Sequence, residues 1–220
     1  MVWRVDVPRR EAAHSMNLFP IFLKLAGRRC LVVGAGPVGE SKIESLCLAG
    51  ADVRVVAPRA TRVVRAWACA GKVCWEARGF KPADLDSVSL VVAATSSAEL
   101  HEQIFQEARR RRVLCNVVDD PARCDFYYPA VVRRGHLQIA ISTSGHSPAL
   151  AQHLKRELNQ QFGLEYETWV EQLGEARQKL LARAIDPARR RRLLHRLASR
   201  QALEAFLRRR GVAGRHRNRS

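Results

Sequence analysis

A glycine-rich turn constrains the fold of this chain more than any other feature. The sequence Gly34-Ala-Gly36-Pro-Val-Gly39 follows the apolar run CLVV at residues 30–33, which is typical of a buried strand. Residues 38–49 then have the apolar spacing of a helix, and residues 53–57 (VRVVA) predict a second strand. A strand, a G-x-G-x-x-G turn, a helix and a strand in this order predict a unit that binds a dinucleotide.

The three glycines have different roles in such a turn. Gly34 permits the tight turn, Gly36 lets a pyrophosphate approach the backbone, and Gly39 lets the helix pack closely on the strand. The alternative is a glycine-rich turn that binds no ligand. An acid that bonds the ribose hydroxyls is expected after the second strand, but Pro58 and Arg59 stand there. The residues therefore do not separate NAD from NADP.

The alternation of strands and helices continues to about residue 120. Helices are predicted over 63–70 and 99–112, and strands over 73–76, 89–94 and 113–118. Strands that alternate with helices predict an α/β fold, a Rossmann-type doubly wound parallel sheet. Ligands of such sheets lie beyond the carboxyl ends of the strands, which places Thr95, Asn116 and Asp119 near the nicotinamide half of a bound dinucleotide.

The pattern changes after Pro121. Residues 128–132 and 137–142 read as two strands joined by the turn 133–135, which is typical of a hairpin. Ser147-Pro148 reads as the start of a helix, Asp186-Pro187 as the start of a later one, and the pattern stays helical to Arg210. We therefore predict a disordered leader (1–15), a dinucleotide-binding domain (16–120), a hairpin and helix for dimerisation and substrate binding (121–160), a helical domain (161–210) and a basic tail (211–220).

Composition narrows the cellular setting and the class of partner. No apolar stretch approaches the length of about 20 residues that a membrane helix needs, and residues 1–15 lack the apolar core of a signal peptide. None of the six cysteines forms a C-x-x-C pair, which favours reduced thiols in the cytoplasm. The formal net charge of +17 favours anionic partners, although solvated arginine-rich helix faces are an equally good explanation.

Seven short motifs occur in an order that resembles one family. From about residue 18 to about residue 158, the chain is similar to the precorrin-2 dehydrogenase/sirohydrochlorin ferrochelatase family of sirohaem biosynthesis. The similarity rests on Pro20-Ile-Phe-Leu23, Gly34-Ala-Gly36-Pro-Val38, Lys42, Val56-Ala-Pro58, Ala94-Thr95, Asn116-Val-Val-Asp119 and Ser142-Thr-Ser-Gly145-His-Ser147-Pro148.

The resemblance implies a reaction and a site. Precorrin-2 would be oxidised to sirohydrochlorin by NAD, with Asp119 as the catalytic base. Because Asp119-Asp120-Pro121 is also good turn chemistry, a capping role for Asp119 is the alternative. The implied cofactor contacts, together with those expected from the turn, are Gly34, Gly36, Pro37, Val38, Gly39, Pro58, Arg59 and Thr95. The expected substrate contacts are Asn116, Thr143, Ser144, Gly145, His146 and Ser147.

The resemblance also implies a polycarboxylate tetrapyrrole as the substrate and a homodimer as the assembly. The candidates to bind the carboxylates of this substrate are Arg123, Arg133 and Arg134. Some members also insert Fe²⁺ as a second substrate, but Thr143 replaces a functional serine of the bifunctional members, and no Cys/His cluster has ligand spacing, so the metal-binding residues are unknown.

Two other classes of function compete with this reading. A non-enzymatic dinucleotide-sensing regulator would explain the glycine turn, but it gives no reason for the motif at 142–148. A nucleic-acid binder would use the basic helices at 187–210, but the chain has no known binding motif and few aromatic residues for stacking. We therefore expect neither nucleic acid nor membrane as a partner.

Overall fold

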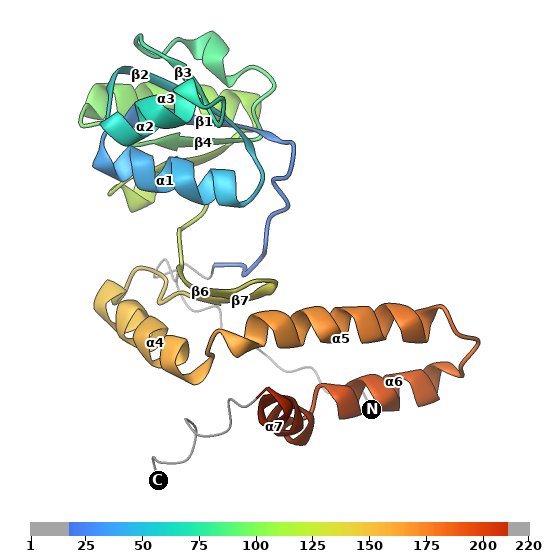
Figure 1. Cartoon of the computed structure of the whole chain (residues 1–220). Helices are drawn as coiled ribbons and strands as arrows, with labels where there is room; N and C mark the ends of the chain where they lie inside the picture. The colour runs from blue at the N-terminus through green and yellow to red at the C-terminus, as the bar shows by residue number, and fades with distance from the viewer. Residues whose placement is uncertain (1–17, 211–220) are drawn as a thin grey trace, which may run out of the picture. The chain divides into compact units, whose positions relative to one another are not determined.

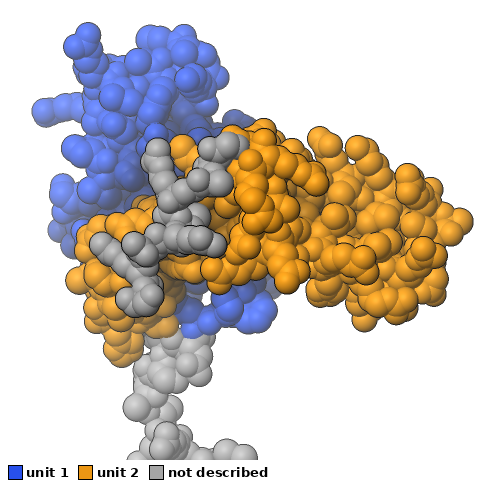
Figure 2. Space-filling view, turned by 60° about the horizontal axis from the view of Figure 1, so that its bottom comes forward, with its two compact units in different colours: residues 1–128 blue, residues 129–220 orange. Residues whose placement is uncertain are grey.

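The computed structural model of the chain describes residues 18–210. The predicted leader at 1–15 and the basic tail at 211–220 lie outside the described residues. The described residues form two compact units, the first ending at Tyr128 and the second beginning at Pro129, which are coloured separately in Figure 2. Within the described part, no helix is both long and apolar enough to cross a membrane.

The first unit is built on a five-stranded sheet. Its strands are β1 (Arg29–Ala35), β2 (Asp52–Ala60), β3 (Cys74–Glu76), β4 (Leu90–Ala93) and β5 (Leu114–Val117). The strand order is β3-β2-β1-β4-β5, and every pairing is parallel (Figure 1). This confirms the predicted doubly wound α/β fold. The chain winds outward from β1 in both directions, so the boundary between β1 and β4 is the point where such folds bind ligands.

Helices cover both faces of this sheet because the buried strands are apolar on both sides. The helices α1 (Pro37–Leu48) and α2 (Arg62–Cys69) bury Ile43, Leu46 and Val64 against one face. Helix α3 (Ala98–Arg111) buries Ile104 and Ala108 against the other face, beside the short 3₁₀ turn Pro82–Leu85. The two apolar clusters use alternate residues of the strands, as the pleat requires.

The segment from Pro121 to Tyr128 belongs to the first unit, although the sequence analysis grouped it with the hairpin. It begins with the 3₁₀ turn Pro121–Arg123 and forms a bridge between Cys124 and Asn116. Phe126 and Tyr128 then pack against the apolar cluster under α1 and α2. These contacts join residues far apart in the sequence, and hydrophobic periodicity carries no information about them.

The described part of the second unit, residues 129–210, contains a hairpin and four helices. The hairpin strands β6 (Ala130–Arg134) and β7 (Leu137–Ile141) are antiparallel, and α4 (Pro148–Gln161), α5 (Glu165–Leu181), α6 (Pro187–Leu197) and α7 (Arg200–Arg209) follow (Figure 1). The predicted helix starts are confirmed, because the side chains of Ser147 and Asp186 accept hydrogen bonds from the backbone amides of Leu150 and Arg189.

Candidate functional site

The glycine turn after β1 packs tightly against the end of β4. Gly34 has a φ of +105°, and a Cβ placed on it would stand 2.2 Å from the carbonyl oxygen of Ala94. A Cβ on Gly39 would stand 2.2 Å from the carbonyl oxygen of Gly34. A Cβ on Gly36, in contrast, would meet no atom within 4 Å. Gly34 and Gly39 are therefore needed for packing, whereas the space over Gly36 is open to a ligand.

The N-terminus of α1 faces this open space with free donors. Gly36 is the N-cap residue, and no side chain bonds the amides of the first turn. The first helical hydrogen bond runs from the Glu40 amide to the Gly36 carbonyl oxygen at 2.8 Å, so the amides of Val38 and Gly39 have no partner within the helix. Free amides at the positive end of a helix beside an open glycine fit the pyrophosphate of a dinucleotide.

No acidic side chain stands at the end of β2 to bind the hydroxyls of a ribose. Pro58 and Arg59 are exposed, and β2 continues past them to Ala60, which pairs with Ala35 after a shift in register. Strand β2 is therefore three residues longer at this end than predicted, and Thr61 then caps α2. Arg59 is the only ionisable residue in the segment Pro58–Thr61, so the geometry fits either a ribose hydroxyl pair or a 2′-phosphate.

The carboxyl ends of β4 and β5 bring two predicted residues to the same edge as the glycine turn. Because β1, β4 and β5 are parallel neighbours, Thr95 and Asp119 follow their strands at the edge where Gly36 lies. Thr95 is half-buried, its hydroxyl accepts a hydrogen bond from the Ser97 amide at 3.4 Å, and its carbonyl oxygen lies 2.9 Å from Nε2 of His101.

Asp119 lies two residues beyond the end of β5. It is exposed and has a φ of +61°, in the left-handed region that aspartate tolerates better than most residues. Asp120, and not Asp119, stands at the N-cap position of the turn Pro121–Arg123, and its side chain makes no capping hydrogen bond there. Among the described residues, none donates a hydrogen bond to the Asp119 carboxylate. Asp120, in contrast, is held by an ion pair with Arg123.

Asn116 lies nearby, but its side-chain amide already makes hydrogen bonds within the first unit. The side chain is buried, and Nδ2 donates to the carbonyl oxygen of Phe126 at 2.8 Å and to Sγ of Cys124 at 3.3 Å. These bonds hold the segment after Asp119 against the end of β5. The geometry favours a role in positioning the Asp119 turn over direct contact with a substrate.

Lys42 is a residue that the sequence analysis named in a motif without assigning it a role. It lies on α1, half-buried, with Nζ 3.8 Å from the centre of the Tyr128 ring. Burial lowers the pKa of Lys42, and the negative charge of Asp119 partly offsets this effect. The structure therefore brings a lysine from the helix of the glycine turn against the Tyr128 ring, a contact between residues far apart in the sequence.

The motif at 142–148 forms a tight loop within the second unit. Ser144 and Gly145 have φ angles of +51° and +83°. The Thr143 hydroxyl accepts from the Ser147 amide at 3.0 Å, and the Ser147 hydroxyl accepts from the Leu150 amide at 3.2 Å. Thr143 and Ser147 therefore hold the loop at the start of α4, while Gly145 and His146 are exposed.

Two of the three arginines considered for substrate carboxylates are already paired. Arg123 donates to Glu102 at 2.6 Å and pairs with Asp120. Arg134 donates to the carbonyl oxygens of Phe162 and Asn159 at 2.7 and 3.0 Å and so holds the end of α4 to the hairpin. Each of these two guanidinium groups has acceptors within its own unit, and their contact with substrate carboxylates stays a prediction. Arg133 stays exposed.

Within the described residues, neither the cysteine thiols nor a group of metal-ligating side chains forms a further candidate site. All six cysteines are free, and burial, with a contribution from the Asp52 charge, raises the pKa of the Cys30 thiol to about 11. In the part of the chain from 18 to 210, no group of three His, Cys, Asp or Glu side chains is arranged to hold a metal ion.

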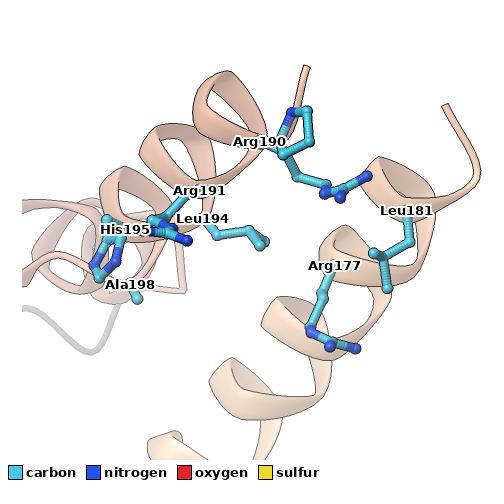
Figure 3. A pocket seen from close by; sticks show the side chains of 8 residues that line it. Arg177, Leu181, Arg190, Arg191, Leu194, His195 and Ala198 are labelled. Carbon is cyan, nitrogen blue, oxygen red and sulfur yellow. The ribbon is translucent and has the colours of Figure 1, made fainter. Parts of the chain in front are cut away.

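A basic hollow of about 510 Å³ lies between α5 and α6 of the second unit. Figure 3 shows Arg190 and Leu194 reaching from α6 toward α5, which contributes Arg177 and Leu181. No acidic residue lines the hollow; its lining is Arg177, Leu181, Pro187, Arg190, Arg191, Leu194, His195 and Ala198.

Comparisons with known proteins place the chain in a family. A family model described as "Putative NAD(P)-binding" matches residues 21–130, and one described as "Sirohaem biosynthesis protein central" matches residues 134–161. Siroheme synthase 1 of Pectobacterium atrosepticum is 41% identical over 182 residues, which are 83% of this chain and 38% of that protein. Siroheme synthase 1 of Serratia proteamaculans is 41% identical over 143 residues, 65% of this chain and 30% of that protein.

A solved structure is similar over almost its whole length. The structure titled SirC, precorrin-2 dehydrogenase, matches with a TM-score of 0.72 at 26% identity, covering 84% of this chain and 91% of that chain. The chain spans less than two fifths of the length of the siroheme synthases just named. Since the NAD(P)-binding match covers half of the chain and coincides with the glycine turn and the sheet that carries it, this protein belongs to that NAD(P)-binding family.

Proposed function

We propose that this protein is an NAD-dependent precorrin-2 dehydrogenase, which oxidises precorrin-2 to sirohydrochlorin in sirohaem biosynthesis. The observation that carries the proposal is the shared edge of the sheet, where the open glycine turn follows β1 and the exposed Asp119 follows β5, two parallel strands with only β4 between them. The relatives named siroheme synthase and the similarity to a precorrin-2 dehydrogenase structure support the choice of substrate.

The chemistry divides between the cofactor and one side chain. The oxidation removes a hydride and a proton from precorrin-2, and a bound NAD supplies the acceptor for the hydride. Asp119 takes the proton: its carboxylate is exposed, lies beyond a strand end, and is not occupied by a hydrogen bond from a described residue. The free amides of Val38 and Gly39 hold the pyrophosphate, and the open position of Gly36 lets it approach.

The proposal extends to the second unit and to the assembly. The loop of Thr143, Ser144, Gly145, His146 and Ser147 contributes polar groups for the carboxylates of the tetrapyrrole, with Gly145 and His146 exposed. Fe²⁺ is a second substrate only if the protein also acts as a chelatase. The six free thiols support a reducing compartment such as the cytoplasm, and exposed apolar side chains such as Leu150 and Leu164 support a homodimer.

The test is an anaerobic assay with precorrin-2 and either NAD or NADP, followed by the absorbance of sirohydrochlorin. We expect turnover with the wild-type protein and a loss of at least about 100-fold in kcat for Asp119→Asn. The matched control is Asp120→Asn, which removes the adjacent carboxylate and should keep most of the activity. Equal activities of Asp119→Asn and the wild type would reject Asp119 as the base.

Two further measurements, of dinucleotide binding and of sirohaem formation with added Fe²⁺, distinguish the dehydrogenase from the regulator and test ferrochelatase activity. Tight dinucleotide binding without turnover by any form of the protein would favour the regulator over the enzyme. Added Fe²⁺ that gives sirohaem faster than a protein-free control would add ferrochelatase activity, and a rate equal to that control would exclude it.

A further inference from the structure

Asp119 occupies the third position of a four-residue turn. The turn runs from Val117 to Asp120 and is closed by a hydrogen bond from the Asp120 amide to the Val117 carbonyl oxygen at 2.9–3.2 Å turn geometry, here 3.2 Å. The φ of +61° at Asp119 is the sign that a type II turn requires at its third position, where glycine or asparagine is favoured. Aspartate is less stable in this conformation than glycine, so contacts from the surrounding structure are needed to hold the turn.

The Cys124 thiol lies between the two ends of this turn. Its Sγ is 3.1 Å from the carbonyl oxygen of Val117 and 3.1 Å from the carbonyl oxygen of Asp120. A thiol carries one proton, so the two carbonyl oxygens share it. Because Val117 begins the turn and Asp120 ends it, the thiol bonds the backbone on both sides of Asp119.

Cys124 is itself anchored to β5, the strand that leads into the turn. Nδ2 of Asn116 donates to Sγ of Cys124 at 3.3 Å, and the two residues form an antiparallel bridge. The next residue adds two bonds: the Asp125 amide donates to the Cys115 carbonyl oxygen at 2.8 Å, and the Asp125 carboxylate accepts from the Cys115 amide at 2.9 Å. The thiol is therefore held in place from outside the turn.

The surroundings of Cys124 keep its thiol a hydrogen-bond donor. The residue is half-buried, and burial raises the pKa of the thiol, so it stays protonated at neutral pH. A thiolate could only accept hydrogen bonds and would leave both carbonyl oxygens without this donor. Arg123 also restrains this region, but it pairs with the side chain of Asp120, whereas the thiol acts on the backbone of the turn.

We propose that Cys124 is a positioning residue for the dehydrogenase: its thiol, shared by the carbonyl oxygens of Val117 and Asp120, holds the turn that presents Asp119 at the carboxyl edge of the sheet. This inference rests on the proposed function, in which Asp119 accepts the proton. In this role Cys124 contacts neither substrate nor cofactor and transfers no proton. Its effect is on the geometry of the base, so it appears in kcat and in the stability of the turn.

Steady-state kinetics test the proposal with three variants of the whole chain. Cys124→Ala removes the thiol, Cys124→Ser keeps a proton donor at the same place, and Cys47→Ala is the matched control, because it removes another half-buried thiol of the first unit. We expect Cys124→Ala to lower kcat about tenfold or more, since a small misplacement of a catalytic group has effects of this size. Cys124→Ser should restore most of kcat, Cys47→Ala should resemble the wild type, and the KM for NAD should change little in all three.

Three kinetic results would overturn the proposal. A kcat of Cys124→Ala equal to that of the wild type would remove any link between the thiol and the base. Equal losses in Cys124→Ala and Cys124→Ser would assign the effect to packing of the sulfur and not to its hydrogen bonds. A large rise in the KM for NAD with an unchanged kcat would make Cys124 part of the cofactor site.

Amide hydrogen exchange without substrate separates this inference from the proposed function. The Asp120 amide closes the turn, so its protection reports whether the turn is held. We expect this protection to fall about tenfold in Cys124→Ala and to be kept in Cys124→Ser, in line with the loss of one hydrogen bond. Equal protection in Cys124→Ala and the wild type would reject the role of Cys124 even if the enzyme is active. Lowered protection together with absent turnover by the wild type would reject only the dehydrogenase.

A glycine in place of Asp119 gives a second background for the same measurement. Glycine adopts a positive φ readily, so Cys124→Ala should lower the protection of the Asp120 amide less in Asp119→Gly than in the wild type. If Cys124→Ala alone does not fold, we expect the double variant to fold. Equal effects of Cys124→Ala in the two backgrounds, or a double variant that stays unfolded, would show that the thiol does not act on the turn at Asp119.

Discussion

Gly39 faces the backbone of Gly34 so closely that a Cβ on Gly39 would stand 2.2 Å from the Gly34 carbonyl oxygen. The start of α1 is thereby pressed against the end of β1, and Gly36 between them is left in open space. The three glycines of one motif therefore serve two different purposes. Two of them permit the fold, and the third permits the approach of a ligand.

Alanine substitutions should separate these purposes. Gly39→Ala forces a backbone shift and should lower the free energy of unfolding by at least about 2 kcal/mol, in the range of overpacked sites. Gly36→Ala should leave stability nearly unchanged, because its Cβ meets no atom within 4 Å, but should weaken NAD binding about tenfold or more. Urea denaturation and calorimetric titration with NAD measure the two effects. Equal NAD affinity in Gly36→Ala and the wild type would place the pyrophosphate elsewhere.

The buried carboxylate of Asp84 should make the first unit sensitive to acid. Burial by itself raises the pKa of Asp84, but hydrogen bonds from Arg78 and the Lys81 amide, with the charges of Arg78 and Arg54, outweigh it and hold the pKa below its usual range. A lowered folded pKa contributes stability above the unfolded value of about 3.9, and this contribution is lost as the pH falls through the folded pKa.

Replacement of Asp84 tests this expectation. Asp84→Asn removes the more buried of the two carboxylates, Asp84 and Glu76, that Arg54 and Arg78 share. It should therefore cost about 3 kcal/mol at neutral pH and flatten the fall in stability below about pH 4. The control is Asp86→Asn, an exposed residue whose removal should cost less than about 0.5 kcal/mol. Urea denaturation at a series of pH values gives both numbers, and parallel pH curves for Asp84→Asn and the wild type would contradict the account.

Removal of the Tyr128 hydroxyl should not weaken the protein. The hydroxyl is buried without a hydrogen-bond partner, so the folded state has lost its hydration and gained nothing in return. Tyr128→Phe keeps the ring under Lys42 and should be as stable as the wild type or more stable by up to about 1 kcal/mol. Thermal unfolding followed by circular dichroism measures the difference. A loss above about 1 kcal/mol would mean that the hydroxyl has a partner.

Charge repulsion in the basic hollow of the second unit should make the stability of the protein depend on salt concentration. Arg191 and His195 are one helical turn apart on α6, and the side chains of Arg177, Arg190 and Arg191 make no ion pair within the described part of the chain. Because Arg177 and Arg190 line the same hollow and no acidic residue does, Arg191→Gln should raise stability at low ionic strength by roughly 0.5 kcal/mol, and added salt should reduce this gain. A gain that is independent of salt would exclude charge repulsion as its cause.

Features that depend on neighbours in the sequence could be predicted from it. Alternating apolar runs predicted the parallel sheet and its helices, and Ser147 and Asp186 were correctly predicted to start helices. These features follow from local backbone and capping chemistry, which acts over a few residues. The glycine turn belongs to the same class, because the requirements of Gly34, Gly36 and Gly39 are set by one turn.

The tertiary structure decided what depends on residues far apart in the chain. It placed Phe126 and Tyr128 with the first unit, gave Arg123 and Arg134 acceptors within their own units, buried the amide of Asn116, and seated Lys42 of α1 on the Tyr128 ring. Periodicity and motif spacing describe one element at a time, whereas burial and charge pairing depend on which elements pack together. The sequence by itself therefore determined the elements and the candidate base, and only the packing decided which charged groups remain free to act.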